Sequence, residues 1–457
     1  MPQAALGTPD HTAVPALKGY PVLGCLPQFW REPLFTLVSA QREGGDVVRM
    51  DLGTRRFYLL SHPDHVRRVL QENAKNYVKG YNRVKVLLGN GLVMNEGASW
   101  LHQRRLMQPA FHQGRLAELA STMVQETQDM LGRWEASAYE ERPLDVAEEM
   151  TLLTQRIIVK TMFGAKAGAG SEKLARAFDT ALAGIDTRSF MPSWFGRLPI
   201  PFNRRFERAL AILDEEVYRI IRERRRGGHE KSDDLLAMLM EARDEETGES
   251  MSDRQLRDEV MTIYLAGHET TAAALSWGWY LLSKNPDAAR KVRDEVSYVL
   301  KGRWPSLEDL PALVYTRMVI DETLRLYPPA WVVSRKAVED DEMGGYRITA
   351  HSRLMLSPYV THRRADLWEN PEGFDPQRFA PGSGDGWQRY AYYPFGGGPR
   401  QCIGNNFALM EATLVLSAVA QRYQLALVPG LEVSAKPKAT LRPHPGIWMM
   451  LHAASPA

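Results

Sequence analysis

Residues 395–404, FGGGPRQCIG, place one sulfur atom in a backbone too rich in glycine to form a helix or a strand. The chain has two cysteines in 457 residues, and one of them, Cys402, lies in this loop two residues after Arg400. A thiolate persists where positive potential is close. The glycines also let the backbone approach a flat, bulky group. The stretch therefore suggests a thiolate that binds a soft metal or attacks an electrophile.

The segment after the loop, NNFALMEATLVLSAVAQRY (405–423), has the apolar spacing of a helix. Cys402 then lies just before a helix N-terminus, where the helix dipole favours an anion. Two other interpretations stay open at this point. A lone cysteine is commonly a small buried apolar side chain. A nucleophilic cysteine would need a partner histidine, which the sequence does not locate.

Bulk composition narrows the class of protein. Hydrophobic residues make up 44% of the chain, and 57 Lys and Arg against 55 Asp and Glu give a net charge of +2, so global charge does not indicate nucleic-acid binding. Residues 1–30 are rich in proline and glycine and contain no continuous apolar stretch. This favours neither a signal peptide nor a transmembrane anchor. We expect a cytoplasmic, monomeric enzyme.

The residue pattern predicts a mainly α chain with small peripheral β-sheets. Apolar residues recur at helical spacing between about residues 110 and 300. One long helix is expected from a capping box at Ser252 and Gln255 to about Lys284. Short β-rich runs lie at 46–63, near 345–360 and at 422–452.

Two segments interrupt the helical pattern. Residues 191–202, MPSWFGRLPIPF, include Trp194 and form either an apolar lid or a loop packed on the core. Residues 224–234, RRRGGHEKSDD, are expected to be a solvated loop.

Several catalytic motifs are incomplete or missing. HETTA (268–272) has Ala272 where a zinc peptidase needs its second histidine. GNGLVM (89–94) and GAGSEK (168–173) lack the third glycine of a dinucleotide fingerprint. No Walker loop or Gly-x-Ser-x-Gly elbow occurs. Nicotinamide and flavin sites for any redox chemistry are therefore expected on another protein, with no fused reductase.

The cysteine loop resembles the haem-binding loop of the cytochrome P-450 monooxygenases. It matches Phe-x-x-Gly-x-Arg-x-Cys-x-Gly through Phe395, Gly398, Arg400, Cys402 and Gly404. In that family the cysteine is the axial iron ligand. The resemblance implies haem b, bound between the long central helix and the helix after the loop. It also implies that residues 1–457 form a single haem domain.

Two further motifs occur in the family's order. ETLR (322–325) places Glu322 and Arg325 on one helix face. FDPQRF (374–379) supplies Arg378, with Gln377 in place of the family's usual glutamate. The resemblance implies a structural Glu–Arg–Arg network that supports the cysteine loop.

AGHETT (266–271) lies midway along the predicted long helix, although glycine and threonine are poor helix formers. By itself this segment suggests a packing notch or a bend. The resemblance implies an oxygen-activation motif instead, in which Glu269 and Thr270 are catalytic and relay protons for O–O bond cleavage.

Other side chains are assigned to the haem propionates by the resemblance. They are Trp100 and Arg104 of SWLHQRR (99–105), Arg335 and Arg400. Guanidinium–carboxylate pairing is the physical reason for arginine at such places. Arg105 is expected on a solvated face.

The leading hypothesis is a monooxygenase that hydroxylates or epoxidises a fatty acid, a terpenoid or a carotenoid-like molecule with O2. Electrons would come from a ferredoxin or flavodoxin and its NAD(P)H reductase. Alternatives are a haem-thiolate peroxygenase or isomerase, and a haem-binding sensor without turnover. By analogy with the family, the substrate pocket would include the segment after residue 80, the lid at 190–202 and these residues: Leu265, Ala266, Ala330, Val332, Val333 and Thr440.

Overall fold

The computed structural model describes residues 13–80, 84–164, 170–191, 195–226, 234–244 and 246–454. Trp194 of the expected lid, and residues 227–233 of the expected loop, lie outside these ranges. The chain divides into two compact units. Unit 1 consists of Met1–Tyr81, Trp331–Glu372 and Gly386–Cys402, and unit 2 of Asn82–Ala330, Gly373–Asp385 and Ile403–Ala457.

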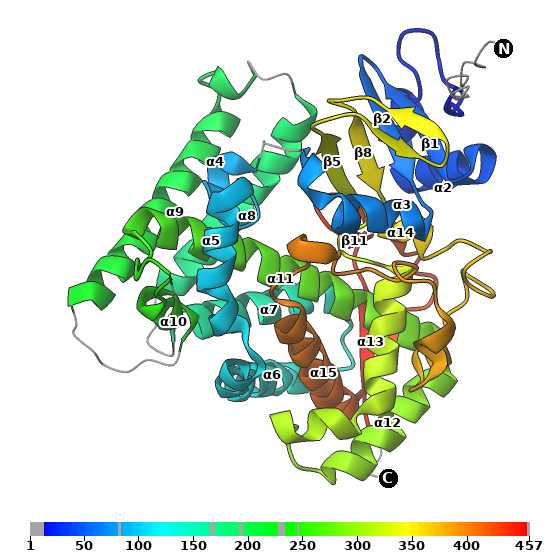
Figure 1. Ribbon diagram of the computed structural model, residues 1–457. Helices are drawn as coiled ribbons and strands as arrows, with labels where there is room; N and C mark the ends of the chain where they lie inside the picture. Colours follow the sequence, from blue (N-terminus) through cyan, green and yellow to red (C-terminus); the bar gives the residue numbers. More distant parts are fainter. Residues whose placement is uncertain are drawn as a thin grey trace, which may run out of the picture. The chain divides into compact units, whose positions relative to one another are not determined.

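Unit 1 is built on a five-stranded sheet with the strand order β1-β2-β8-β5-β3 (Figure 1). Its strands are β1 (Val47–Leu52), β2 (Arg55–Leu60), β3 (Tyr77–Lys79), β5 (Val333–Ala337) and β8 (Arg353–Leu356). β1 and β2 form the antiparallel hairpin expected at 46–63, whereas β8 runs parallel to β2. Because the chain between β2 and β8 is long, only tertiary structure could reveal this pairing.

The other elements of unit 1 are short. They are α1 (Leu26–Arg31), α2 (Pro33–Gly44), α3 (Pro63–Arg67), η1 (Arg68–Glu72), η2 (Ala74–Asn76), β6 (Asp341–Met343), β7 (Tyr346–Ile348), α14 (Pro358–Thr361) and η8 (Gly398–Arg400).

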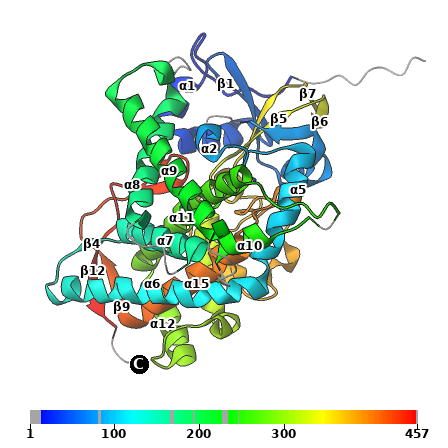
Figure 2. The ribbon, with the colours of Figure 1, turned by 90° about the vertical axis from the view of Figure 1, so that its left-hand side faces the viewer.

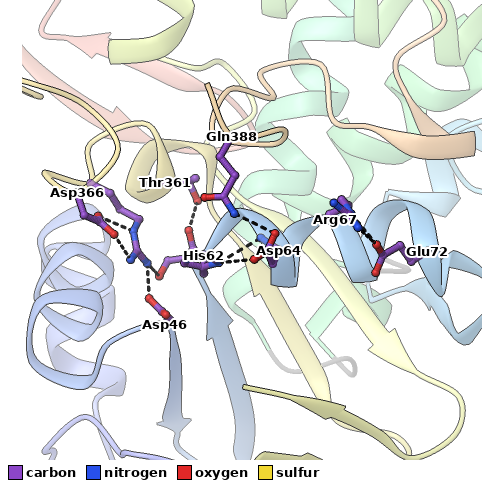
Figure 3. A network of polar contacts seen from close by, with 10 residues as sticks. Asp46, His62, Asp64, Arg67, Glu72, Thr361, Asp366 and Gln388 are labelled. Carbon is purple, nitrogen blue, oxygen red and sulfur yellow. Dashed lines mark hydrogen bonds and ion pairs between the residues drawn. The ribbon is translucent and has the colours of Figure 1, made fainter. Parts of the chain in front are cut away.

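A polar network joins distant segments of unit 1 (Figure 3). Arg364 donates from Nη1 to Asp46 at 2.6 Å and from Nη2 to Asp366 at 2.7 Å. Gln388, in the segment that leads to the cysteine loop, donates to Asp64 at 2.9 Å. Thr361 donates to the carbonyl of Ser61 at 2.9 Å. These bonds attach the 386–402 segment to α3, and they attach α14 and Arg364 to the residues that precede β1 and follow β2.

Unit 2 is largely helical. Its helices are α4 (Lys85–Leu88), α5 (Gly97–Met107), η3 (Gln108–Phe111), α6 (Gln113–Tyr139), α7 (Val146–Phe163), α8 (Gly170–Phe190), η4 (Phe195–Arg197), α9 (Pro201–Arg226), α10 (Leu235–Glu241), α11 (Asp253–Lys284), α12 (Pro286–Leu300), η5 (Leu307–Ala312), α13 (Val314–Leu326), η6 (Pro376–Phe379), η7 (Ser383–Gly386) and α15 (Asn405–Arg422). Two small sheets accompany them, β4 (Leu144–Asp145) with β12 (Trp448–Ala453) and β9 (Tyr423–Leu427), and β10 (Ser434–Pro437) with β11 (Leu441–His444).

Helix α11 is the centre of unit 2. Its 32 residues begin after Ser252, whose hydroxyl accepts the Gln255 N–H at 3.2 Å, and end at Lys284, as the sequence predicts. Helices α7, α13 and α15 pack against α11. Helix α6 packs against α7 and α15 (Figure 2). Most side chains of α11 are buried, because it has packing partners on several faces.

The two expected interruptions differ in part from the sequence predictions. α9 continues to Arg226, so the prediction of a loop from residue 224 is wrong for 224–226. Arg224 donates to the Phe163 carbonyl at 2.8 Å and pairs with Asp234, which explains why this charged residue is held in a helix.

The first interruption is fixed from the residue that follows it. Buried Asn203 donates to the carbonyls of Phe195 and Leu198 at 2.7 and 2.8 Å.

No helix in the described ranges is long and apolar enough to cross a membrane.

Candidate active site

The cysteine loop of unit 1 presents an exposed thiol. The Cys402 N–H donates to the carbonyl of Phe395 at 3.0 Å, which closes the loop. Cys402 is exposed, whereas Cys25 is fully buried, its Sγ 3.4 Å from the Asp51 carbonyl oxygen. Burial raises the pKa of the Cys25 thiol. The common role of a small buried apolar residue therefore belongs to Cys25 and not to Cys402.

Glycine is required at one position of this loop for two reasons. Gly398 has φ +63°, a conformation that side chains rarely adopt, and a Cβ there would overlap the backbone carbonyl of Leu70 in η1. Gly396 has φ +69° but open space around it. The loop geometry thus depends on close backbone contact between η8 and η1.

Unit 2 brings the Glu–Arg–Arg residues together. Arg325 donates from Nε to Glu322 Oε2 at 2.7 Å and from Nη2 to Oε1 at 2.8 Å, with both side chains fully buried. Arg378 Nε lies 3.4 Å from Glu322 Oε1. Glu322 also accepts the Asp375 N–H at 2.9 Å, and Arg325 donates to the Gly373 carbonyl at 2.9 Å. The pair therefore fixes the chain that enters η6, where Arg378 lies.

AGHETT lies in regular helix in the middle of α11. Thr270 Oγ1 donates to the Ala266 carbonyl at 2.7 Å, which is the i−4 bond expected of a helical threonine. A Cβ at Gly267 would lie 2.9 Å from Ile158 Cδ1 of α7. The packing-notch interpretation is thus correct for Gly267, which lets α7 approach. It does not account for the residues beside it.

A short strip of α11 is less buried than the rest of the helix. Ala266 is exposed, and Leu265 and Thr270 are half-buried, although their neighbours in the helix are mostly buried. Ala266 and Thr270 are four residues apart and so share one face. This face is the part of the middle of α11 that is open to solvent.

Glu269 is bound from the β10–β11 hairpin, which the sequence motif did not indicate. Its Oε1 accepts from Thr440 Oγ1 at 2.7 Å, from Arg442 Nε at 2.9 Å and from Arg442 Nη2 at 2.6 Å. The Glu269 side chain is 6% exposed and that of Arg442 is 42% exposed. Thr440, expected to line a substrate pocket, is buried against the carboxylate. Arg442 was missed because the sequence LRPH carries no motif.

Two other titratable groups lie near this carboxylate. His268 is buried, which lowers its pKa, and its Nδ1 is 2.8 Å from the Tyr264 carbonyl. Burial raises the pKa of Asp179 in α8, while the charges of His268 and Arg442 oppose the shift. Asp179, His268 and Arg442 are therefore the titratable and charged groups that interact with Glu269.

The residues assigned to the propionates lie in both units. Trp100 is buried and Arg104 half-buried, one turn apart on α5. Arg335 is buried in β5, where its Nη1 donates to the Ser334 carbonyl at 3.0 Å, and Arg400 is half-buried in η8. Arg105 forms an exposed ion pair with Glu246 at 2.7 Å, as expected of a solvated face.

The remaining pocket candidates also lie in both units. Ala330 of unit 2 is half-buried, as are Val332 and Val333 of unit 1.

The segment after residue 80 is fixed to α11 by charged side chains. Asp258 accepts the Asn90 N–H at 2.8 Å, and Glu259 accepts the Leu92 N–H at 2.9 Å. Arg257 donates to the carbonyl of Leu87 at 2.8 Å. A run of Arg-Asp-Glu in a helix is usually solvent-exposed, so sequence reasoning missed these contacts.

Comparison with known proteins agrees with the haem-thiolate class that the cysteine loop and the helical fold define. The family model described as Cytochrome P450 matches residues 14–450. The chain therefore belongs to the cytochrome P450 family and is a P450 monooxygenase, a haem-iron oxidoreductase.

Its relatives include cyclooctatin synthase of Streptomyces melanosporofaciens, 39% identical over 95% of this chain and 94% of the relative. Pentalenene oxygenase of Streptomyces avermitilis is 33% identical over 98% of this chain and 99% of the relative. The crystal structure of the cytochrome P450DA haem domain superimposes with a TM-score of 0.90 at 27% identity, covering 98% and 99% of the two chains.

The residues present fit the haem-thiolate cofactor that the family implies. The exposed thiol of Cys402 follows a turn that Gly398 fixes against η1, while a Cβ at Gly396 or Gly404 would meet no atom within 4 Å, so the loop leaves room for a bulky group. Arginines on α5, β5 and η8 supply the guanidinium groups that pair with carboxylates.

Proposed function

We propose that this protein hydroxylates or epoxidises a lipophilic terpenoid with O2, with haem b ligated by Cys402. The exposed Cys402 in its closed loop carries this proposal, together with the membership in the P450 family. Bound haem supplies the chemistry of O2 activation, and the thiolate donates electron density to the iron. Trp100, Arg104, Arg335 and Arg400 would hold the propionates, within a single haem domain.

The substrate class is inferred from relatives and from the accessible residues. The names of two relatives denote an alkene, pentalenene, and an unsaturated alcohol, cyclooctat-9-en-7-ol. Leu265, Ala266, Ala330, Val332 and Val333 are small or apolar and at least partly accessible, which suits a hydrocarbon skeleton. Of the three lipid classes that the sequence raised, terpenoids are therefore favoured over fatty acids and carotenoid-like molecules.

The proton path would run through α11. Glu269 is a buried carboxylate next to Thr270, whose side chain lies on the accessible face of the helix. Thr270 would hold a proton donor at the site, and Glu269 would supply protons to it. Family members that work as peroxygenases or isomerases do not need such a pair, which is why we favour a monooxygenase.

Electrons would come from a ferredoxin or flavodoxin with its NAD(P)H reductase. Arg104 and Arg400 add positive charge, whereas Arg105 is paired with Glu246, so an acidic partner is favoured and its rate of reduction should fall as salt rises. Reduction that is independent of salt would contradict an electrostatic partner.

The absorption spectrum of the reduced CO complex tests whether Cys402 is the thiolate ligand. The wild type and a Cys25→Ala control should show the red-shifted Soret band of thiolate ligation, while Cys402→Ser should lose it. A Cys402→Ser protein that keeps this band would refute the ligand assignment.

Titration with terpenoid alkenes and alcohols, fatty acids and carotenoids then tests the substrate class. Terpenoids should change the spin state of the ferric haem at the lowest concentrations. A preference for fatty acids, or the failure of every apolar ligand to shift the spectrum, would refute the terpenoid assignment.

A further inference from the structure

The β10–β11 hairpin is attached to α11 at two places, through Thr440 at its turn and through the first residues of β11. Near the middle of the helix, Glu269 accepts from Thr440 and Arg442. Further along, Trp277 Nε1 donates to the Leu441 carbonyl at 2.8 Å, and the Leu441 N–H donates to the Pro329 carbonyl at 3.0 Å. The hairpin backbone is therefore fixed independently of the carboxylate, and it offers two side chains to Glu269 from a fixed position.

The hydrogen bonds that the described residues make to the carboxylate converge on one oxygen. Thr440 Oγ1, Arg442 Nε and Arg442 Nη2 all donate to Oε1. Among the described residues, no hydrogen bond reaches Oε2 of Glu269. Oε1 therefore holds the side chain in place, and Oε2 takes no part in that contact.

The titratable and charged groups near Glu269 come from three elements. Arg442 of β11 is in direct contact, His268 is the preceding residue of α11, and Asp179 of α8 adds a second acidic group. A buried carboxylate beside another acid needs a cation to stay in place. Arg442 is the cation that contacts it.

We propose that Arg442 and Thr440 are positioning residues that anchor Oε1 of Glu269, so that Oε2 is oriented for proton delivery. This inference rests on the proposed proton-delivery role of Glu269. The proton would pass from Oε2–H to the acceptor at Thr270, and Oε2 would then be reprotonated from solvent, so no oxidant or reductant is needed. Neither Arg442 nor Thr440 touches the reacting atoms in this scheme.

The test compares the haem-loaded wild type with Glu269→Gln, Arg442→Gln and the double variant. With a surrogate ferredoxin and reductase and a spin-shifting ligand, Arg442→Gln should slow NAD(P)H oxidation about tenfold and raise its solvent deuterium isotope effect. In the Glu269→Gln background the same substitution should change neither quantity further, because its target is absent. Additive losses, or an oxidation rate in Arg442→Gln equal to or above the wild-type rate, would overturn the proposal.

Two controls distinguish a loss of Glu269 positioning from a general disruption of the hairpin. Lys436→Gln removes an exposed cation from β10, the strand that pairs with β11, and should leave the rate unchanged. Thr440→Val should slow oxidation, while Thr440→Ser, which keeps the donor, should restore it. A Thr440→Ser variant as slow as Thr440→Val would contradict the role of the hydroxyl.

A thermal unfolding cycle on the same four proteins gives a readout that does not need turnover. The effect of Arg442→Gln on the unfolding midpoint should be smaller in the Glu269→Gln background than in the wild type. The effects of the two substitutions on the unfolding midpoint could be non-additive while Glu269→Gln oxidises NAD(P)H like the wild type. That result would refute proton delivery by Glu269 but would support the contact between Arg442 and Glu269. If the effects of the two substitutions on the midpoint are additive, the stabilising contact between Arg442 and Glu269 is itself refuted.

Discussion

Arg325 and Glu322 are joined by two parallel hydrogen bonds of 2.7 and 2.8 Å, and neither side chain is exposed to solvent. This geometry satisfies both ions in a site without water. Glu322 also accepts the Asp375 N–H, and Arg325 donates to the Gly373 carbonyl. The pair therefore fixes the backbone at 373–375, about 50 residues further along the chain.

Arg325→Ala should therefore be severely destabilising. It leaves Glu322 buried without its main partner, and removing one member of a buried pair costs about 3–5 kcal/mol. Urea unfolding followed by far-UV circular dichroism would measure this loss. Arg317→Ala on the same helix removes a cation that is 46% exposed in its pair with Asp321, and should cost less than about 1 kcal/mol. Equal losses in the two variants would contradict the importance of burial.

Gly398→Ala should prevent normal haem incorporation, because the added Cβ would overlap the Leu70 carbonyl and move the cysteine loop. The matched variant is Gly396→Ala, which has a similar φ but open space, and strain alone should cost it about 1–2 kcal/mol. The ratio of haem to protein after purification measures the difference. Full haem content in Gly398→Ala would show that the η8–η1 contact is dispensable.

Thr270→Ala should uncouple electron transfer from product formation. Without the hydroxyl on the accessible face of α11, NAD(P)H should still be oxidised but hydrogen peroxide should replace product. Peroxide released per NAD(P)H consumed is the measurement. Thr180→Ala, which removes an equivalent i−4-bonded hydroxyl from the exposed face of α8, is the control. Tight coupling in Thr270→Ala would exclude the proposed role.

Asp341 should make stability depend on pH. Burial alone would raise its pKa, but hydrogen bonds from Arg68 and Tyr77 outweigh burial and lower the pKa to about 2. Because the folded pKa lies below the unfolded value of about 3.9, the stabilisation is complete above about pH 5 and is lost as pH falls toward 2.

Asp341→Asn should accordingly be less stable than the wild type by about 2 kcal/mol at pH 7, and the gap should narrow between about pH 5 and 2. Denaturant titrations at a series of pH values measure the gap. Asp340→Asn, which breaks an exposed pair with Arg347, should show a gap below about 1 kcal/mol throughout. A gap for Asp341→Asn that is constant with pH would refute the assignment.

Several elements were predictable because their signals are local. Ser252 and Lys284 bound α11 where capping and the following Asn-Pro predict, and the hairpin at 46–63 forms around a glycine with positive φ. The loop prediction at residue 224 was wrong because Arg224 finds an acceptor at Phe163, 61 residues earlier. No local pattern records such a partner.

The sequence by itself determined the resemblance of the cysteine loop to the family's haem-binding loop, because the five matching residues lie within ten positions. The resemblance of AGHETT to the family's oxygen-activation motif likewise predicted a role for Glu269 and Thr270 from adjacent positions. Only the tertiary structure decided that Glu269 is bound through Oε1 to Arg442, 173 residues away. The packing of the hairpin against α11 brings that guanidinium to the buried carboxylate, and sequence spacing does not encode it.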